Sequence, residues 1–85
     1  MKKSTGTYYK YCYRSKKTGR FFVFHELCDD GYGRYSDDIS LKELNKGVLP
    51  TLHDKNEVPM GDWKEHDENE VEKVKLKIDV KVTAE

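Results

Sequence analysis

The C-terminal part of this chain alternates between apolar and charged residues with a period of two. The aliphatic positions are Val74, Leu76, Ile78, Val80 and Val82, and the charged positions between them are Lys73, Lys75, Lys77, Asp79 and Lys81. Because successive side chains of a strand point to opposite faces, this pattern predicts a long strand over 71–83 with one wet face. Such a strand is typical of antiparallel sheets, and its lysines would protect a sheet edge.

A β-hairpin is predicted near the N-terminus. Two segments rich in β-forming residues, Thr7–Arg14 and Arg20–Leu27, flank the loop Ser15-Lys16-Lys17-Thr18-Gly19. A glycine at the last loop position suits the left-handed residue that closes a type I turn. The glycine-containing segment 29–33 is then expected to form a turn.

A short helix is predicted after residue 36. Ser40 and Glu43 have the spacing of a capping box, Asp37 and Asp38 would complement the start of the helix, and Gly47 would end it. A helix of about two turns needs tertiary packing to be stable. The polar segment 53–70 is expected to be a long loop, part of which could form a short strand.

These elements predict a single α+β domain over residues 1–85, with frayed ends at 1–6 and 84–85. The N-terminal hairpin and the C-terminal strand would form a small antiparallel sheet, and the short helix would cover its apolar face. A small SH3-like barrel is the alternative, because long loops between few strands could curl the sheet. With 38% charged and 35% hydrophobic residues, the core should be modest.

The zero net charge conceals an asymmetry along the chain. Residues 1–25 contain seven Lys or Arg and no acid, whereas residues 26–85 contain nine cations and sixteen acids. If the fold does not bring the two parts together, the basic part suits a phosphate group or an acidic partner.

The register of the hairpin decides which of its faces points outward. A three-residue loop pairs Lys10 with Glu26 and leaves Phe22 and Phe24 on the outer face. A four-residue loop shifts the pairing by one and moves these two rings to the face of Tyr9, Tyr11 and Tyr13. The favourable cross-strand pair of Lys10 and Glu26 favours the three-residue loop.

In that register the hairpin has an aromatic and cationic outer face, which is the predicted partner-binding site. Its residues are Tyr8, Lys10, Arg14, Lys16, Lys17, Arg20, Phe22 and Phe24. Arg and Tyr dominate protein–protein hot spots, and aromatic rings beside cations can also stack the bases of a single strand. The alternative is that a second layer, formed by 53–70 with Trp63, covers this face.

No metal, cofactor or catalytic site is predicted. In the favoured register His25 points away from Cys12 and Cys28, which are too far apart for one metal or a disulfide. The two cysteines are expected to be free thiols in a reducing compartment. The acid–histidine combinations at 37–38, 53–54 and 62–67 have plainer explanations as helix-start or solvated loop charges. No phosphate-binding loop, GxSxG or HExxH motif is present.

These observations lead to the hypothesis of a non-enzymatic binding module that sterically occludes a protein partner. By analogy with small phage-encoded inhibitors, the partner would be a host protein. Met1-Lys2-Lys3 is not followed by an apolar segment and there is no transmembrane run, so a cytoplasmic location without a membrane partner is expected. A single-stranded nucleic-acid binder using the same face is the alternative. The chain is expected to be a monomer, or a homodimer that pairs exposed strand edges.

Overall fold

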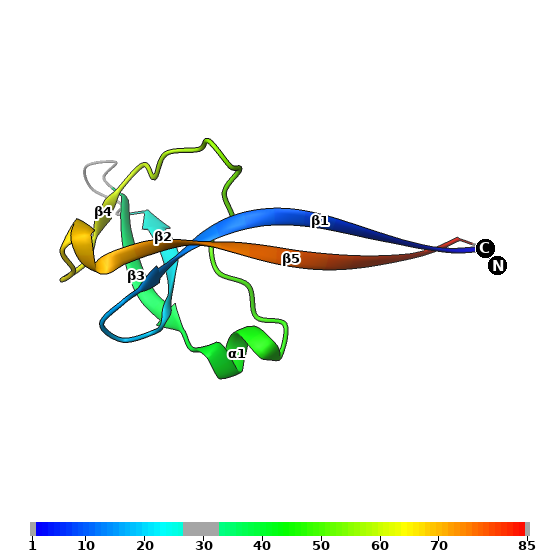
Figure 1. Ribbon diagram of the computed structural model, residues 1–85, viewed down its shortest axis with the longest axis horizontal. Coiled ribbons are helices and arrows are strands. Elements are labelled where there is room, and N and C mark those ends of the chain that lie inside the picture. The colour runs from blue at the N-terminus through cyan, green and yellow to red at the C-terminus, as the bar shows by residue number, and fades with distance from the viewer. Residues whose placement is uncertain (1, 27–32, 85) are drawn as a thin grey trace.

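Strands β1 (Lys2–Ser15) and β5 (Val71–Ala84) pair along their whole length and form the longest feature of the molecule (Figure 1). The computed structural model describes residues 2–26 and 33–84. The antiparallel register runs from Lys2 opposite Ala84 to Ser15 opposite Val71. The predicted C-terminal strand is therefore confirmed, and its partner is the N-terminal strand.

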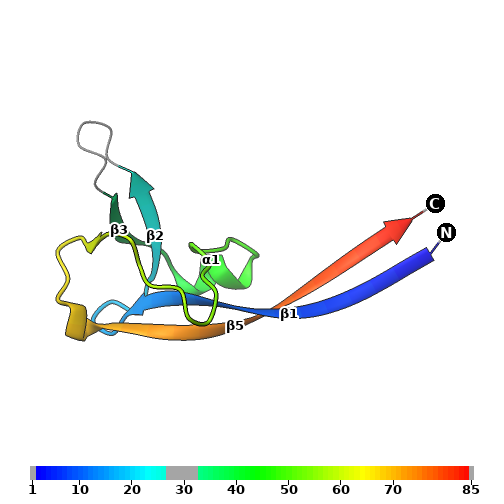
Figure 2. The same cartoon turned by 90° about the horizontal axis from the view of Figure 1, so that it is seen from above.

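Three further strands complete a curled five-stranded sheet. They are β2 (Phe21–Glu26), β3 (Gly33–Ile39) and β4 (Asp62–Trp63), and the strand order is β4-β3-β2-β1-β5. Figure 2 shows β2 and β3 turning away from the pair of β1 and β5. The expected α+β class is thus confirmed, and the sheet is curled, as the barrel-like alternative proposed. The sheet is mixed and not wholly antiparallel, because β3 and β4 run parallel.

The predicted long hairpin of β1 and β2 is not formed. The two strands are paired at Arg14 and Phe21, next to the turn. Further along β1, the backbone N–H and C=O of Tyr11 pair with His53 at 2.9 and 2.7 Å instead. The long partner of β2 is β3, a strand that the sequence analysis interpreted as a turn followed by a helix start.

The loop between β1 and β2 has four residues, 16–19, because the N–H of Ser15 donates to the carbonyl of Arg20 at 2.9 Å. The side chain of Ser15 accepts hydrogen bonds from the N–H groups of Lys17 and Thr18, each at 3.2 Å. Gly19 closes the turn in the left-handed region with φ 74°, as predicted. The favoured three-residue loop is therefore wrong, and the four-residue alternative is the register of the structure.

Helix α1 (Leu41–Asn45) starts with the predicted capping box. The Ser40 side chain accepts from the N–H of Glu43, the Glu43 side chain accepts from the N–H of Ser40, and Gly47 follows with φ 93°. Asp37 and Asp38 do not lie at the helix start, because they belong to β3. The segment 53–70 contains β4 and a short 3-10 helix, η1 (Glu68–Glu70).

Both faces of β2 are buried at its start, and each face has its own cluster of side chains. Phe21 and Phe22 point to opposite faces and are 2% and 1% exposed. The first cluster lies beneath α1 and consists of Cys12, Phe21, Val23, Ile39, Leu44, Val74 and Leu76. The second, called the aromatic cluster below, consists of Tyr13, Phe22, Phe24, Tyr35, His53 and Trp63, with ring centroids 4.7–5.9 Å apart.

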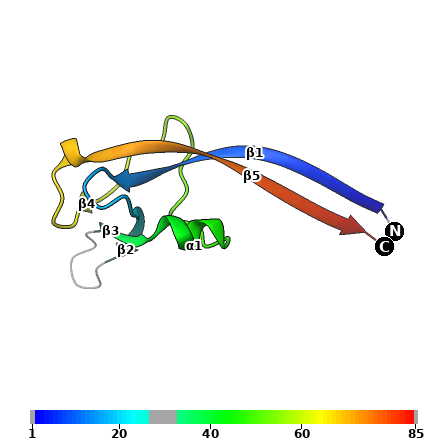
Figure 3. The ribbon, with the colours of Figure 1, turned by 60° about the horizontal axis from the view of Figure 1, so that its bottom comes forward.

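The pair of β1 and β5, called the ribbon below, projects from this body. In Figure 3, α1 lies below the ribbon, and both strands run on beyond it towards the two termini. The Cα atoms of the molecule span 48 × 29 × 23 Å, and the projecting ribbon accounts for the elongated shape. Cys28 and most of the predicted turn at 29–33 lie outside the described residues.

Candidate functional site

The eight residues predicted to bind a partner do not share one surface. Phe22 is buried in the aromatic cluster, where its ring centroid lies 5.0 Å from that of Trp63 and 5.1 Å from that of His66. Phe24 is half-buried and packs against Tyr35. The prediction that these two rings face outward is wrong, and the alternative in which Trp63 covers Phe22 is confirmed. The cause is the four-residue loop, which turns both rings to the face that the 51–66 segment covers.

The cations of the predicted site either form ion pairs and hydrogen bonds within the chain or lie far from one another. Arg14 forms an ion pair with Glu72, donating from Nε at 2.7 Å. Arg20 donates to the carbonyl oxygens of Asp37 and Asp38, each at 2.8 Å.

The expected pair of Lys10 with Glu26 is not formed, because Lys10 pairs with Asp54 at 2.5 Å. Tyr8 lies on the ribbon, whereas Lys16 and Lys17 lie at the turn at the other end of β1.

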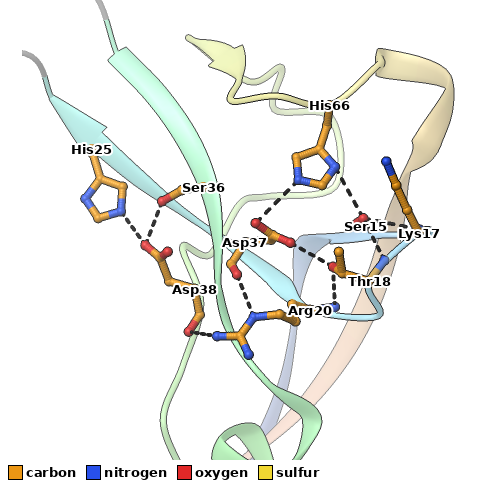
Figure 4. Close-up of polar contacts among 9 residues, drawn as sticks. All are labelled: Ser15, Lys17, Thr18, Arg20, His25, Ser36, Asp37, Asp38 and His66. Atoms are coloured by element: carbon orange, nitrogen blue, oxygen red, sulfur yellow. Dashed lines mark hydrogen bonds and ion pairs between the residues drawn. The ribbon is translucent and has the colours of Figure 1, made fainter.

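A polar network that the sequence analysis missed lies beside the turn (Figure 4). His66 is at its centre: Nδ1 is 3.4 Å from Ser15 Oγ, and Nε2 is 3.4 Å from Asp37 Oδ1. The other oxygen of Asp37 accepts a hydrogen bond of 2.7 Å from Thr18. A serine, a histidine and an aspartate are therefore connected in the order found in nucleophilic hydrolases.

The geometry of this network indicates a structural role. Ser15 is 0% exposed, so its oxygen has no path to a substrate. That oxygen already accepts two backbone N–H groups of the turn, which leaves its own proton to donate to His66. A catalytic serine needs both an activating base and access to the reacting carbon. The network instead ties the turn to β3 and to the loop before η1.

A β-bulge in β3 directs the two neighbouring aspartates to different histidines. Phe21 lies opposite Ile39 and Val23 opposite Ser36, so two residues of β3 face the single residue Phe22. Asp37 reaches His66, while Asp38 lies 2.6 Å from His25 Nε2 (Figure 4). The sequence signal was the pair of acids itself, which also fits a helix start.

Hydrogen bonds hold the pKa of both aspartates below the ordinary value. Burial by itself would raise the pKa of Asp37, but bonds from Thr18, from its own N–H and from His66 outweigh that effect. The pKa of Asp38 is lowered mainly by hydrogen bonds from the Ser36 hydroxyl and from His25. Both groups therefore remain carboxylates down to acidic pH, and no general acid is expected among them.

Two hollows flank the loop around Val58. The larger, of about 650 Å³, is lined by Tyr13, Trp63, His66, Val71 and Lys73 among others. The smaller, of about 350 Å³, is lined by Phe24, Tyr35, Leu52 and Met60 among others. Val58 and Met60 themselves are strongly exposed, so this loop presents apolar side chains to solvent between the hollows.

A tyrosine ring and several lysine side chains are exposed on one face of the ribbon. Its pairing places Tyr9 opposite Lys77 and Tyr11 opposite Lys75, so that rings and ammonium groups share one face. Tyr9 is 52% exposed, and Lys75 Nζ lies 4.5 Å from the centre of its ring. Lys73 Nζ lies 5.0 Å from the centre of the Tyr11 ring. We call the residues Tyr9, Tyr11, Lys73, Lys75 and Lys77 the tyrosine–lysine face.

Charge is segregated between the ribbon and the rest of the chain. The two ribbon strands contain eight Lys or Arg and two Asp or Glu, while the remaining residues contain eight cations and fourteen acids. Acids from later in the chain neutralise the basic N-terminal part only in places, where Lys10 pairs with Asp54 and Arg14 with Glu72. The ribbon keeps an excess of positive charge, because β1 is paired with the lysine-rich strand β5.

Comparisons with known proteins give no indication of function. No protein-family model, curated protein or solved structure matches the chain. Within residues 2–26 and 33–84, no group of three or more His, Cys, Asp or Glu side chains is placed to hold a metal ion. Over the same residues, no helix has the length and apolar character needed to cross a membrane.

Proposed function

We propose that this chain is a non-enzymatic binding module whose ribbon occupies a site on an acidic intracellular protein. The segregation of charge is the observation that supports this proposal, because eight cations and two acids belong to the two strands of the ribbon, whose outer part projects from the body. Complementary charge accelerates encounter and fixes the orientation of the partners. The proposal keeps Tyr8 of the predicted set and replaces Phe22 and Phe24 with the tyrosine–lysine face.

The proposed mechanism is steric occlusion. A two-stranded ribbon is marginally stable in water by itself, so a partner surface that covers it would stabilise the ribbon and the complex together. Tyr9 and Tyr11 supply large contact areas with few rotatable bonds, and Tyr residues are enriched at the centres of protein interfaces. By analogy with small phage-encoded inhibitors, the covered surface on the partner would be one that its own ligand needs.

A single-stranded nucleic acid is the second candidate, and the tyrosine–lysine face is the observation that favours it. Tyr9 and Tyr11 lie two positions apart on one face, with the ammonium groups of Lys75 and Lys73 beside them. In single-strand binding, tyrosine rings stack on the bases while lysine ammonium groups contact the phosphates. However, each ring already has an ammonium group over it, which leaves less ring surface for a base.

The test compares affinity capture by two charge-reversal variants and the unaltered protein. The ribbon variant has Lys75→Glu and Lys77→Glu; the matched control has Lys42→Glu and Lys64→Glu, which make the same charge change at exposed positions of the body. We expect one protein, resistant to nuclease treatment, to be captured by the unaltered chain and the control variant but not by the ribbon variant.

Oligonucleotide titrations at low and moderate salt complete this test. Binding that weakens steeply as salt rises would replace the proposal with the second candidate, because phosphate contacts release counterions. Capture that is equal for all three proteins would show that the ribbon is not the binding element, and the proposal would be abandoned.

A further inference from the structure

The outer edge of β5 is free for pairing along the ribbon. In the strand order β4-β3-β2-β1-β5, this strand is the last one, and none of the described strands pairs with its other side. An unpaired row of N–H and C=O groups is a template for an added strand. The 58–68 segment lies near the start of β5, where Val71 and Lys73 line the larger hollow.

The backbone groups that face this free edge belong to lysines. Tyr11 gives both its N–H and its C=O to His53, on the side of β1 that faces away from β5. In an antiparallel pair of strands, two directly opposed residues point their N–H and C=O groups either both towards each other or both away from the pair. Lys75, which lies opposite Tyr11, therefore directs its N–H and C=O away from β1. The period of two extends this orientation to Lys73 and Lys77.

The side chains along the edge define what an added strand must contain. The lysines lie on one face of β5, while Val74, Leu76 and Ile78 lie half-buried on the other. A second copy of β5 fits less well than an acidic strand: antiparallel pairing centred on Leu76 places Lys75 opposite Lys77 twice, which two pairs of Lys73 and Asp79 offset only in part. Like charges directly opposite each other destabilise a sheet, whereas opposite charges stabilise it.

We propose that β5 binds an extended segment of an acidic protein by strand addition, with Asp or Glu alternating with aliphatic residues in the added strand. This inference rests on the proposed function and states how the ribbon makes its contact. The carboxylates of the segment lie opposite Lys73, Lys75 and Lys77, and its aliphatic residues continue the row of Val74, Leu76 and Ile78. The main-chain hydrogen bonds supply affinity, and the alternation supplies specificity.

The first experiment uses peptides as probes. An acetylated and amidated peptide of alternating Glu and Val or Ile is compared with the same peptide carrying Lys in place of Glu. Hydrogen exchange of the full-length, nitrogen-15-labelled protein is followed by NMR. We expect the acidic peptide to slow exchange at the N–H groups of Lys75 and Lys77, and we expect the basic peptide to leave them unchanged. Unchanged exchange with the acidic peptide, or protection confined to another surface, overturns the inference.

Two variants test the two parts of the contact separately. In Lys75→Glu with Lys77→Glu, the preference should invert, so that the basic peptide binds at least about tenfold more tightly than the acidic one. Lys75→Pro removes an outward N–H at a position where an edge strand tolerates proline, and binding should be lost. Lys75→Gln keeps that N–H and should retain weakened binding. Equal binding by the proline and glutamine variants overturns strand addition.

The outcomes distinguish this inference from the proposed function. If capture depends on the ribbon but the acidic peptide leaves the β5 amides unprotected, the binding module stands and strand addition fails. If light scattering shows a dimer that Lys75→Pro abolishes, the edge belongs to a second copy of the chain and strand addition of an acidic partner is wrong.

Discussion

At the residue scale, the buried polar side chains beside the turn have partners within the chain, whereas Nε2 of His53, in the aromatic cluster, has no hydrogen-bond partner among the described residues. Ser15 is bound by its own turn, and Asp37 is held by Thr18 and His66. Groups that already have internal partners are not available to a substrate. Asp37 and His66, which belong to the acid–histidine combinations considered in the sequence analysis, therefore stabilise the fold.

Asp37 should contribute to stability at neutral pH and lose that contribution in acid. Its pKa in the folded protein lies below the ordinary value of 3.8, so the stabilisation is present above that value and is lost as the pH falls through the lowered pKa. We expect Asp37→Asn to lower the free energy of unfolding by about 1–2 kcal/mol at pH 7. The difference from the unaltered protein should shrink below pH 4.

Urea denaturation between pH 2 and pH 7 measures this effect. Asp62→Asn is the matched control, because Asp62 is an exposed aspartate, and its substitution should change stability by less than about 0.5 kcal/mol. An Asp37 variant that is as stable as this control at pH 7 would contradict the role assigned to the network.

Cys12 should be an unreactive thiol in the folded protein. Burial raises its pKa to about 11, against which the nearby Arg14 has a smaller opposite effect. Thiolate is the reactive form, and Cys12 is also fully buried. In a Cys28→Ser variant, we expect a thiol reagent at pH 8 to modify Cys12 only as fast as the protein unfolds. Modification that is complete before unfolding begins would show that the first cluster is open to solvent.

At the element scale, local signals predicted the elements that are specified by their own residue pattern. The alternation of 71–83 predicted β5, the pair Ser40 and Glu43 predicted the cap of α1, and Gly19 predicted the turn. The missed strand β3 contains Asp37 and Asp38, which fit a helix start equally well until the bulge and the two histidines are known. The partner of β1 is about sixty residues away, and no local pattern specifies such a pairing.

The register of the turn shows why the candidate site was misplaced. One residue of difference in loop length decides the face of Phe22, and the charge pair of Lys10 with Glu26 favoured the wrong choice. The four-residue turn is stabilised by the Ser15 side chain, which accepts hydrogen bonds from two N–H groups of the turn. A serine at the start of a loop is a signal for such a turn, but it is weak compared with a cross-strand ion pair.

Phe22 should be essential for stability, whereas Tyr9 should not. Phe22→Ala removes a buried ring from contact with Trp63 and His66, and we expect it to lower the free energy of unfolding by about 3–5 kcal/mol. Tyr9→Ala removes an exposed ring and should cost less than about 1 kcal/mol. Chemical denaturation of the two variants measures the difference. Equal losses would mean that the aromatic cluster does not support the fold.

At the scale of the whole molecule, the projecting ribbon and the body should differ in local stability. Near the body, the paired residues Cys12 and Val74 belong to the first cluster, while Tyr8 and Ile78 pair further out along the two strands. Regions with few buried contacts open with lower free energy. We expect the amides of Tyr8 and Ile78 to exchange with solvent faster than those of Cys12 and Val74.

Hydrogen exchange followed by NMR measures this gradient in the free protein. Uniform protection along both strands would indicate that the ribbon is already covered, for example by a second copy. A gradient that disappears when a partner binds would identify the outer ribbon as the segment that the partner stabilises.

The pairing of Lys2 with Ala84 places the two ends of the backbone side by side at the far tip of the molecule (Figure 1). A short peptide linker could join them and leave the sheet unaltered, producing a cyclic chain with no free end to unravel. Cyclisation would also restrict the unfolded ensemble, which favours the native state. Conversely, a fluorescent protein or purification handle fused to either end would stand beside whatever binds the tip.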